Sequence, residues 1–289
     1  MSRTVLHVLD GTAALFRAWF SVNERPAPDG VEVGAVWGFG QWLGKVVRRT
    51  RPTHLAVVFD AGMWTFRNEI WPDYKANRGE PPDDLVPQFD LAYDLCVALG
   101  FPSFRTDGYE ADDLMATLAR RAVGAGLEAA LVTPDKDVLQ LVSDAVCVLD
   151  PKELDAIDGP MVKERFGVEA SQLVDYLALA GDPTDNVPGV KGVGPKTAQA
   201  LIAAFGSVDG LYEDLDRVAT LDVRGAKGLG DKLREHEEEA RLSRRLVVLD
   251  EEAPMEPEIR TLGDLRLRGT PDGADRFFSR VGFPSPLDS

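Results

Sequence analysis

Nine carboxylates fall into five short clusters along the chain, each beside an apolar run or a glycine turn. Carboxylates repel one another, so this many converge at one place only around bound cations. Oxygen-only ligand sets suit Mg²⁺ or Mn²⁺, and pairs of such ions about 3.5–4 Å apart commonly serve phosphoryl transfer. The sequence therefore predicts a two-metal site. Its expected ligands are Asp10, Asp60, Glu110, Asp112, Asp113, Asp135, Asp137, Asp182 and Asp185.

The elements that must position these carboxylates follow from the apolar pattern. Short apolar runs predict buried strands, and amphipathic stretches between them predict helices. This alternation predicts an α/β fold, with a mostly parallel sheet and helices on both faces. The expected strands are Val5–Leu9, Leu55–Phe59, Ala129–Val132 and Val146–Leu149, and the expected helices are Val33–Val47, Leu85–Leu99 and Ala111–Ala125.

Three of the clusters lie where a predicted strand ends. Asp10, Asp60 and Asp135 each follow such a strand, and parallel sheets bind ligands at this edge. Glu110 and Asp113 are three residues apart at a helix start, so we expect them to share a face. A single aspartate at a strand end is more often a turn former or a helix cap. The prediction therefore depends on all five clusters occurring together.

Two regions interrupt the α/β pattern. Residues 63–84 carry aromatic and basic residues without clear periodicity, so we expect a surface excursion that is mobile until a ligand binds. Beyond about residue 172 the strand signals stop, which predicts a soft boundary near 165–175. We expect a catalytic domain at 1–170 and a helical region at 171–289.

A glycine-rich stretch follows the last acidic cluster. Residues 186–202 hold two glycine turns and then a predicted helix from Pro195, since proline is favoured at the first helical position. Such a hairpin offers backbone N–H groups and lysines to a phosphate, although a glycine loop before a helix would give the same local pattern. The expected contacts are Gly189, Lys191, Gly192, Gly194, Lys196 and Thr197.

Basic residues accompany the acidic clusters. Tyr74 in YKANR is expected to stack on a base, and Lys75 and Arg78 to neutralise charge at a phosphate. Arg67 and Arg17 are further candidates, for binding and for catalysis respectively. Each of these residues alone would equally suit a solvated basic face.

Composition and charge bear on which partners and which cellular compartment the protein could have. The 289 residues carry a formal net charge of −16, which at first argues against a nucleic-acid partner. Residues 186–206, however, contain two lysines and no acid. The chain has no apolar run of about 18 residues, and its two cysteines, Cys96 and Cys147, are expected to be core thiols. We therefore expect a cytoplasmic protein without a membrane partner.

Together the motifs resemble one known family. LDGTAALFR, VVFDA, YKANR, GYEADD, TPDKD and GDPTDNVPGVKGVGPKTA occur in the order and spacing of the bacterial 5′-nuclease family. That family includes flap endonucleases and the N-terminal 5′→3′ exonuclease domain of DNA polymerase I. The resemblance covers about residues 3–250. One departure is Thr12-Ala13, where many relatives have two histidines.

The resemblance implies a PIN-like fold with a flexible arch at about 63–90 and a helix-three-turn-helix module at about 173–206. It implies a 5′→3′ exonuclease and 5′-flap endonuclease, active in primer removal and DNA repair, that binds flaps, overhangs, nicks or RNA–DNA hybrids as a monomer. Two Mg²⁺ or Mn²⁺ ions and, in some relatives, a K⁺ ion at the module accompany this activity. The clusters from Asp10 to Asp113 are implied to serve mainly the first metal, and those from Asp135 to Asp185 mainly the second.

Two other functions are compatible with parts of the pattern. A small-phosphoester hydrolase would share the metal ligands, but it would not need a separate phosphate-binding hairpin. A non-catalytic DNA-binding paralogue would share the hairpin, but the sequence retains every expected carboxylate. The balance of exonuclease and flap cleavage stays open at this point, as does the preference for RNA or DNA.

Overall fold

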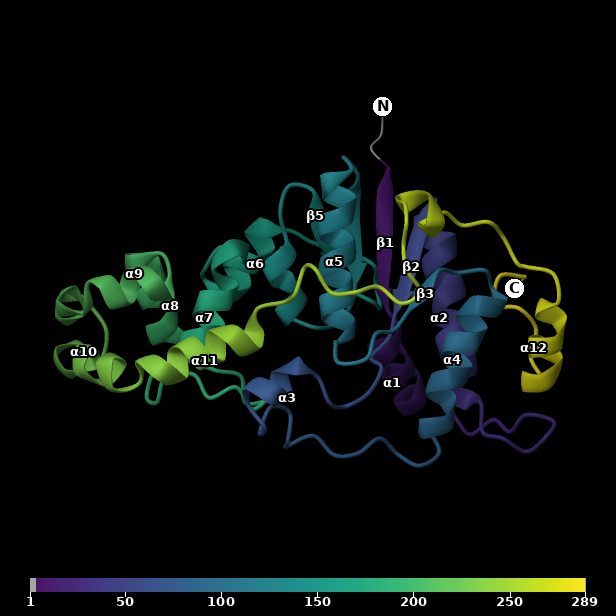
Figure 1. Ribbon diagram of the computed structural model, residues 1–289, viewed down its shortest axis with the longest axis horizontal. Coiled ribbons are helices and arrows are strands. Elements are labelled where there is room, and N and C mark those ends of the chain that lie inside the picture. The colour runs from purple at the N-terminus through teal and green to yellow at the C-terminus, as the bar shows by residue number, and fades with distance from the viewer. Residues whose placement is uncertain (1–3, 289) are drawn as a thin grey trace.

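The computed structural model describes residues 4–288 and is built around a six-stranded sheet (Figure 1). The strand order is β3-β2-β1-β4-β5-β6, and all neighbours are parallel except β5 and β6. The predicted parallel sheet is confirmed, whereas the two short edge strands, β3 and β6, were not predicted. The strands are β1 (Val5–Asp10), β2 (His54–Val58), β3 (Ser103–Phe104), β4 (Glu128–Val132), β5 (Val146–Leu149) and β6 (Ala156–Ile157).

Helices cover both faces of the sheet, as the alternation predicted. Helices α1 (Gly11–Ser21), α2 (Gly34–Thr50) and α4 (Val86–Ala98) lie on one face, and α5 (Ala111–Gly124) lies on the other. Successive strand residues point to opposite faces. In β1, Leu6 and Val8 pack with α5, while Leu9 packs with α1 and α2.

A helical extension continues from the α5 side of the sheet and forms the left-hand end of Figure 1. It comprises α6 (Gly159–Phe166), α7 (Leu173–Ala180), α8 (Pro195–Phe205), α9 (Val208–Glu213), α10 (Ala226–Glu235) and α11 (Glu237–Val247), with the 3-10 helices η2 (Ala170–Gln172) and η3 (Leu215–Thr220). The helical character expected beyond residue 172 is present here.

After α11 the chain returns to the sheet, so the expected C-terminal region is not one continuous unit. The N–H of Arg105 donates to the Glu256 carbonyl at 3.1 Å, and the N–H of Leu267 donates to the Thr53 carbonyl at 3.1 Å. Helix α12 (Ala274–Val281) then lies beside α4, after the 3-10 helix η4 (Leu262–Leu265). Residues from about 250 onward therefore belong structurally to the sheet.

Part of the segment 63–84 is packed rather than a surface excursion. It contains the short helix α3 (Phe66–Ile70), and Thr65, Arg67, Asn68 and Tyr74 are all buried. The expectation of an exposed segment is wrong for these residues. Their anchors are polar, so they leave no apolar periodicity in the sequence. Residues 79–84, which follow, are largely exposed.

None of the described helices combines the length and the apolar character needed to cross a membrane. Both cysteines are free, with Cys96 buried and Cys147 half-buried.

One glycine sets the approach of β1 to β2 at the edge where Asp10 and Asp60 lie. A Cβ built on Gly11, the first residue of α1, would lie 2.4 Å from Cε1 of Phe59. Phe59 is itself 3% exposed and held in the core. The absence of a side chain at position 11 thus lets the two strand ends, and the aspartates beside them, come together.

Gly11→Ala should therefore destabilise the fold by about 1–3 kcal/mol, because the added methyl forces Phe59 or the strand end to move. Denaturant unfolding would measure this change. The matched control is Gly124→Ala, since a Cβ at this other helical glycine meets nothing within 4 Å. Equal stability of the two variants would contradict the close-approach argument.

Candidate metal centre and phosphate-binding hairpin

The acidic centre lies at the carboxyl edge of the sheet, where the strand order changes direction. Asp10 is the last residue of β1, Asp60 follows β2, and Asp135 follows β4. The chain passes from β1 to β2 on one side, and β4 pairs with β1 on the other. Sheets of this type bind ligands at the strand ends beside such a change of direction.

One threonine holds two of these carboxylates together. The hydroxyl of Thr133 donates to Oδ2 of Asp10 at 2.8 Å, and it accepts the N–H of Asp135 at 3.1 Å. The other oxygen of Asp10 accepts the N–H of Ala13 at 2.9 Å and caps α1. The aspartate at the end of β1 is thereby fixed relative to the loop after β4.

The start of α5 brings the GYEADD cluster to the same edge. Oδ1 of Asp60 accepts the N–H of Ala111 at 2.8 Å, while the N–H of Asp60 donates to Oγ1 of Thr12 at 2.8 Å. Glu110 is the N-cap with extended backbone, and Asp112 lies in the first turn. The positive end of a helix dipole stabilises carboxylates in these positions.

Burial and mutual repulsion disfavour the charged forms of these groups. Burial raises the pKa of Asp10 to about 7, and the charges of Asp60 and Asp135 add to this shift. Burial, followed by the charges of Asp135 and Asp10, raises the pKa of Asp112 well above its usual range. Burial and the Glu110 charge also raise the pKa of Asp60. Cations at this edge would restore the ionised forms.

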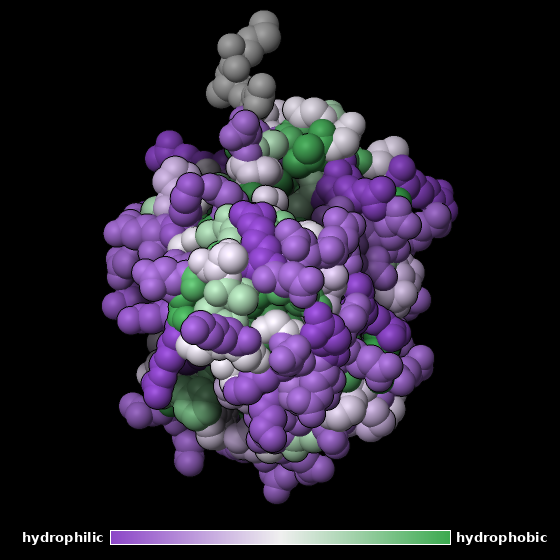
Figure 2. Space-filling view, turned by 90° about the vertical axis from the view of Figure 1, so that its left-hand side faces the viewer, coloured by the Kyte–Doolittle hydropathy of each residue, from purple (hydrophilic) through white to green (hydrophobic). Residues whose placement is uncertain are grey.

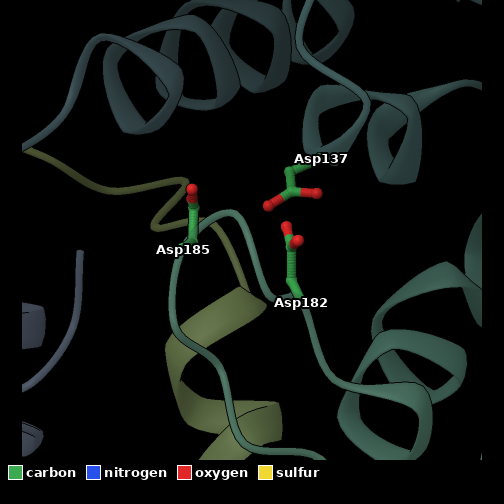
Figure 3. Close-up of side chains that lie close together, drawn as sticks. All are labelled: Asp137, Asp182 and Asp185. Carbon is green, nitrogen blue, oxygen red and sulfur yellow. The ribbon is translucent and has the colours of Figure 1, made fainter. Parts of the chain in front are cut away.

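The second acidic group is compact. Asp137, Asp182 and Asp185 each offer a carboxylate oxygen, and these oxygens all lie within 4.8 Å of one another (Figure 3). Asp137 begins the 3-10 helix η1 (Asp137–Leu141), and the other two lie in the turn after α7. Across the described residues no other trio of potential ligands is as closely spaced, so the carboxylates around Asp10 are more widely spread.

These donors fit a hard divalent cation. All are carboxylate oxygens, the ligands that Mg²⁺ and Mn²⁺ prefer. The buried Oδ1 of Asp137 also has no hydrogen-bond partner within the described part of the chain. Burial, together with the Asp135 charge, raises the pKa of Asp137 to about 7. An oxygen of this kind is stabilised by a bound cation.

Basic side chains balance part of the charge. Lys75 Nζ lies 2.6 Å from Oε1 of Glu110 and 3.5 Å from Oδ2 of Asp185, which Arg78 also contacts. The backbone of Lys75 is left-handed, with φ +56°, and its N–H donates to the Asp185 carbonyl at 3.0 Å. This strained conformation is held by its contacts and directs the ammonium group at the acidic centre.

Lys136 is a further cation that sequence reasoning missed. Its Nζ lies 2.5 Å from Oδ2 of Asp182 and 3.5 Å from Oδ1 of Asp137. The available signal was its position between two predicted ligands, Asp135 and Asp137.

Asp113 and Arg67 form a buried pair that the sequence did not predict. Nη1 and Nη2 of Arg67 donate to the two oxygens of Asp113 at 2.7 and 2.8 Å, and the side chains are 1% and 0% exposed. The same guanidinium donates to the carbonyls of Leu246 and Val248 at 2.8 and 3.0 Å. This pair therefore joins α3, α5 and the chain after α11.

The geometry revises the expectation for Asp113. Besides Arg67, its carboxylate accepts the N–H groups of Glu110 and Asp250 at 3.1 and 2.9 Å. With these contacts its oxygens are engaged by protein donors. Asp112, which the helix-face argument left between Glu110 and Asp113, instead shares the electrostatic environment of Asp10 and Asp135.

Three expected DNA contacts do not fit the structure. Arg67 is 1% exposed and held by Asp113, and Tyr74 is 5% exposed, with its hydroxyl 3.2 Å from Oε2 of Glu110. Gly189 is buried and its N–H donates to Oγ of Ser243 at 2.9 Å. All three stabilise the fold around the site. Arg17 lies 5.4 Å over the Trp42 ring and is in direct contact with none of the site carboxylates.

The predicted hairpin is present between α7 and α8. The two backbone segments of the hairpin approach each other closely at Gly181 and Gly189. A Cβ on Gly189 would lie 2.4 Å from the backbone nitrogen of Gly181. Gly194 is the N-cap of α8, and Pro195 begins the helix as predicted. The expected contacts at Lys191, Gly192, Gly194 and Lys196 are exposed, while Thr197 is half-buried.

The raised pKa values predict how metal binding depends on pH. Without metal, Asp10 and Asp137 bind protons in the folded state up to about pH 7, but in the unfolded state only to about pH 4. These two groups therefore make stability fall as pH rises through that window. Divalent ions need the same groups ionised, so the rise in Tm caused by Mg²⁺ should be small near pH 6 and larger near pH 8.

Thermal unfolding with Mg²⁺ and with EDTA at the two pH values would measure this. The control is the double variant Asp10→Asn with Asp137→Asn, in which the pH dependence should be reduced. A Tm increase of equal size at both pH values would contradict the assignment.

The Arg67–Asp113 pair predicts a stability effect that is separate from metal binding. Asp113→Asn removes the closest counter-charge of the buried guanidinium and leaves only Glu110, whose Oε2 lies 3.3 Å from Nη1. This should cost about 3–5 kcal/mol, and Arg67→Met combined with Asp113→Leu should recover much of it. Titration calorimetry with Mn²⁺ should show that Asp113→Asn retains the ions at temperatures where it is folded. The control, Asp112→Asn, should weaken Mn²⁺ binding. A stable Asp113→Asn protein that no longer binds Mn²⁺ would refute this division of roles.

Two family models match consecutive parts of the chain. The model described as "5′-3′ exonuclease, N-terminal resolvase-like domain" matches residues 5–167, and "5′-3′ exonuclease, C-terminal SAM fold" matches residues 168–270. Among curated proteins, a 5′-3′ exonuclease of Aquifex aeolicus is 38% identical over 212 residues, which is 73% of each chain.

Other relatives are much longer proteins. DNA polymerase I of Rhizobium leguminosarum is 38% identical over 265 residues, covering 89% of this chain and 26% of its own length. The thermostable DNA polymerase I of Thermus thermophilus is 39% identical over 282 residues, covering 97% of this chain and 32% of its own length. The chain thus spans about a quarter to a third of these polymerases.

Solved structures show the same fold. A phage T5 5′-exonuclease with bound divalent metal ions has a TM-score of 0.70 at 26% identity, and the match covers 85% of this chain and 90% of the other. A T5 D15 flap endonuclease, solved as a pseudo-enzyme–product complex with DNA and metal ions, has a TM-score of 0.69 at 25% identity, with coverage of 85% and 89%. By its sequence motifs, its fold and these matches, the chain belongs to the 5′-3′ exonuclease family.

Proposed function

We propose that this chain is a metal-dependent 5′→3′ exonuclease and structure-specific 5′-flap endonuclease that hydrolyses DNA phosphodiesters with two metal ions. The observation that carries the proposal is the turn between α7 and α8. Asp182 and Asp185 at its start belong to the acidic centre, and Lys191 and Lys196 are exposed a few residues later. A reacting phosphodiester and the phosphates of the adjoining duplex would thus be held by one continuous segment.

We assign the carboxylates to two metal positions. Asp10, Asp60, Glu110 and Asp112 would hold the first ion, with Asp113 as the residue that positions α5. The other position would be formed by Asp135, Asp137, Asp182 and Asp185. When bound, two Mg²⁺ or Mn²⁺ ions supply the activation of water and the stabilisation of the departing 3′ oxygen.

Lys75 and Arg78 would act on the phosphate itself. Their cationic groups now contact Glu110 and Asp185, and metal ions would satisfy those carboxylates. The two side chains would then be available to the scissile phosphate, where they compensate charge that grows during cleavage. The Arg67–Asp113 pair keeps their backbone in register by fixing α3 just upstream.

The hairpin between α7 and α8 would bind the duplex. Exposed N–H groups around Gly192 and Gly194 and the lysines beside them suit phosphate oxygens. A K⁺ ion held by carbonyls of this module belongs to the same proposal. So do a domain division near residue 170, with residues from about 250 returning to the first domain, and an arch within 63–90 whose exposed part begins near residue 76. Substrates with 5′ flaps, overhangs, nicks or RNA–DNA hybrids are proposed, with the protein acting as a monomer in the cytoplasm.

The named relatives support a role in nucleic-acid processing. One is called a 5′-3′ exonuclease, and others are DNA polymerase I, of which this chain matches only part. Primer removal and DNA repair are therefore the processes that we propose.

Cleavage of a 5′-labelled flap substrate tests the proposal directly. Mg²⁺ should give products near the junction, and EDTA should abolish them. Lys75→Ala should lower single-turnover cleavage by about 10²–10³-fold, the range found for lost electrostatic stabilisers, with little change in DNA affinity.

The control for that experiment is Lys152→Ala, because Lys152 is 81% exposed and pairs only with Glu153. Hydrolysis of an aryl phosphate without cleavage of DNA would favour the small-phosphoester hydrolase. Binding of flap DNA without cleavage in Mg²⁺ would favour the non-catalytic paralogue.

A further inference from the structure

We infer that α10 carries a second set of phosphate contacts, centred on Lys232 and Lys227, and that these extend the duplex-binding surface beyond the hairpin. This inference rests on the proposed function, because it takes duplex DNA as the ligand. It assigns two residues that lie outside both the acidic centre and the α7–α8 hairpin.

The lysines of the chain divide sharply by position. The sequence contains nine lysines. Five of them, Lys45, Lys75, Lys136, Lys152 and Lys163, contact a carboxylate or a carbonyl. Within residues 4–288, the remaining four make no ion pair and no side-chain hydrogen bond, and they are Lys191, Lys196, Lys227 and Lys232.

This division is unexpected in so acidic a protein. With 48 acidic and 32 basic residues, most surface lysines have carboxylates within reach. Of the acids nearest in sequence to Lys232, Asp231 is engaged by Arg234 at 2.9 Å, and neither Asp231 nor Glu235 forms an ion pair with Lys232 in the described part of the chain. A group of exposed lysines without counter-charges is typical of a surface that meets a polyanion.

Helix α10 also lies next to the hairpin in space. A Cβ built on Gly192 would lie 3.3 Å from Nζ of Lys232, so this ammonium group lies against the exposed turn of the hairpin. The turn carries Lys191, and its glycine adopts φ +85°. The Lys232 ammonium group and the residue next to Lys191 are thus neighbours, so an anion bound at this turn would meet positive charge from two elements.

A six-residue sequence pattern recurs at this place. Lys191-Gly-Val-Gly-Pro-Lys196 is repeated as Lys227-Gly-Leu-Gly-Asp-Lys232. The first copy is a turn that leads into α8, whereas the second lies inside α10. Two glycines inside a helix of ten residues cost about 1 kcal/mol each relative to alanine. Gly230 packs closely on η3, since a Cβ there would lie 3.1 Å from the Leu215 carbonyl oxygen. Gly228 has no such neighbour, so its presence needs another reason.

Close approach of a ligand backbone supplies that reason. Leu229 and Leu233 anchor α10 in the core, and Gly228 lies one turn before Lys232 on the same face. A Cβ at Gly228, or at the N-cap Gly225, would meet nothing within 4 Å. Positions 225, 228 and 232 thus form an open strip of helix backbone that ends at an unpaired ammonium group.

The chemistry of this strip favours a phosphate backbone. The four lysines are spread over two elements, so a single small anion would meet only some of them, whereas successive phosphates of a duplex would meet all. The face of the molecule formed by this end is mainly hydrophilic (Figure 2), which disfavours an apolar partner.

Salt-dependent DNA binding tests the inference. The Asp60→Ala background prevents cleavage, and equilibrium binding of a flap with a long duplex arm is measured over a range of salt concentrations. Lys227→Ala combined with Lys232→Ala should lower the slope of log K against log salt by about 0.9 per lost phosphate contact. Lys232→Arg should retain the slope. Lys152→Ala combined with Lys163→Ala removes the same number of charges from exposed lysines elsewhere, and this control should leave the slope unchanged.

Duplex length locates the contact. If α10 touches the duplex beyond the hairpin, the α10 double variant should bind a flap with a shortened duplex arm as well as the parent does. Lys191→Ala combined with Lys196→Ala should weaken binding to both substrates. An effect of the α10 variant that is equal for the two lengths would overturn the proposed placement.

The two proposals fail in different ways. An α10 double variant with unchanged affinity and slope, in a protein whose hairpin variant binds weakly, would overturn the inference and leave the proposed function intact. A parent protein that binds no flap DNA would overturn the proposed function as well. Loss of slope in the Lys152→Ala, Lys163→Ala double variant equal to that in the α10 variant would show a general charge effect and refute the site.

Discussion

The structure depends on one electrostatic conflict, the confinement of like charges in a partly buried space. Asp10, Asp60 and Asp112 all have raised pKa values because burial and neighbouring carboxylates disfavour their ionised forms. The fold holds them in place with backbone amides and hydroxyls rather than with full counter-charges, as Thr133 does for Asp10. Basic side chains offset only part of the charge, at Glu110 through Lys75 and at Asp182 and Asp185 through Lys136 and Arg78. Divalent cations bound at the carboxyl edge of the sheet would therefore stabilise the ionised forms of these carboxylates.

The remaining architecture serves to bring segments distant in sequence to that edge. Gly11 admits the close contact of β1 with Phe59, and Arg67 ties α3 to α5 and to the chain after α11. Because Arg67 is buried, the base of the segment 63–84 is part of the packed protein, and the continuous exposed stretch begins near residue 76. Lys75 is therefore delivered to the acidic centre by a buried polar anchor. A hydrophobic face plays little part in its placement.

Much of this organisation was predictable from local patterns. Apolar runs gave the four long strands within one or two residues, and acidic residues at their ends gave the centre, because the geometry of parallel sheets is general. Prediction failed where a side chain's role depends on a distant partner. Asp113 lies in the GYEADD cluster and Arg67 lies upstream of YKANR, and nothing local indicates that each neutralises the other. Tyr74 and Gly189 likewise donate hydrogen bonds to Glu110 and Ser243, which are remote in sequence. The return of the chain to the sheet after residue 250 depends on hydrogen bonds to Thr106 and Thr117 and on scattered buried residues such as Leu265, which form no periodic pattern in the sequence.

The central claim is that these carboxylates form two adjacent sites for divalent ions. Anomalous diffraction from crystals of the protein grown with Mn²⁺ measures it most directly, because manganese positions are then located independently of the protein phases. The account predicts two peaks, about 3.5–4 Å apart as in other two-metal centres. One should lie among Asp137, Asp182 and Asp185, and the other nearer to Asp10 and Asp112. A single peak, or peaks at surface carboxylates with none at the carboxyl edge of the sheet, would contradict it.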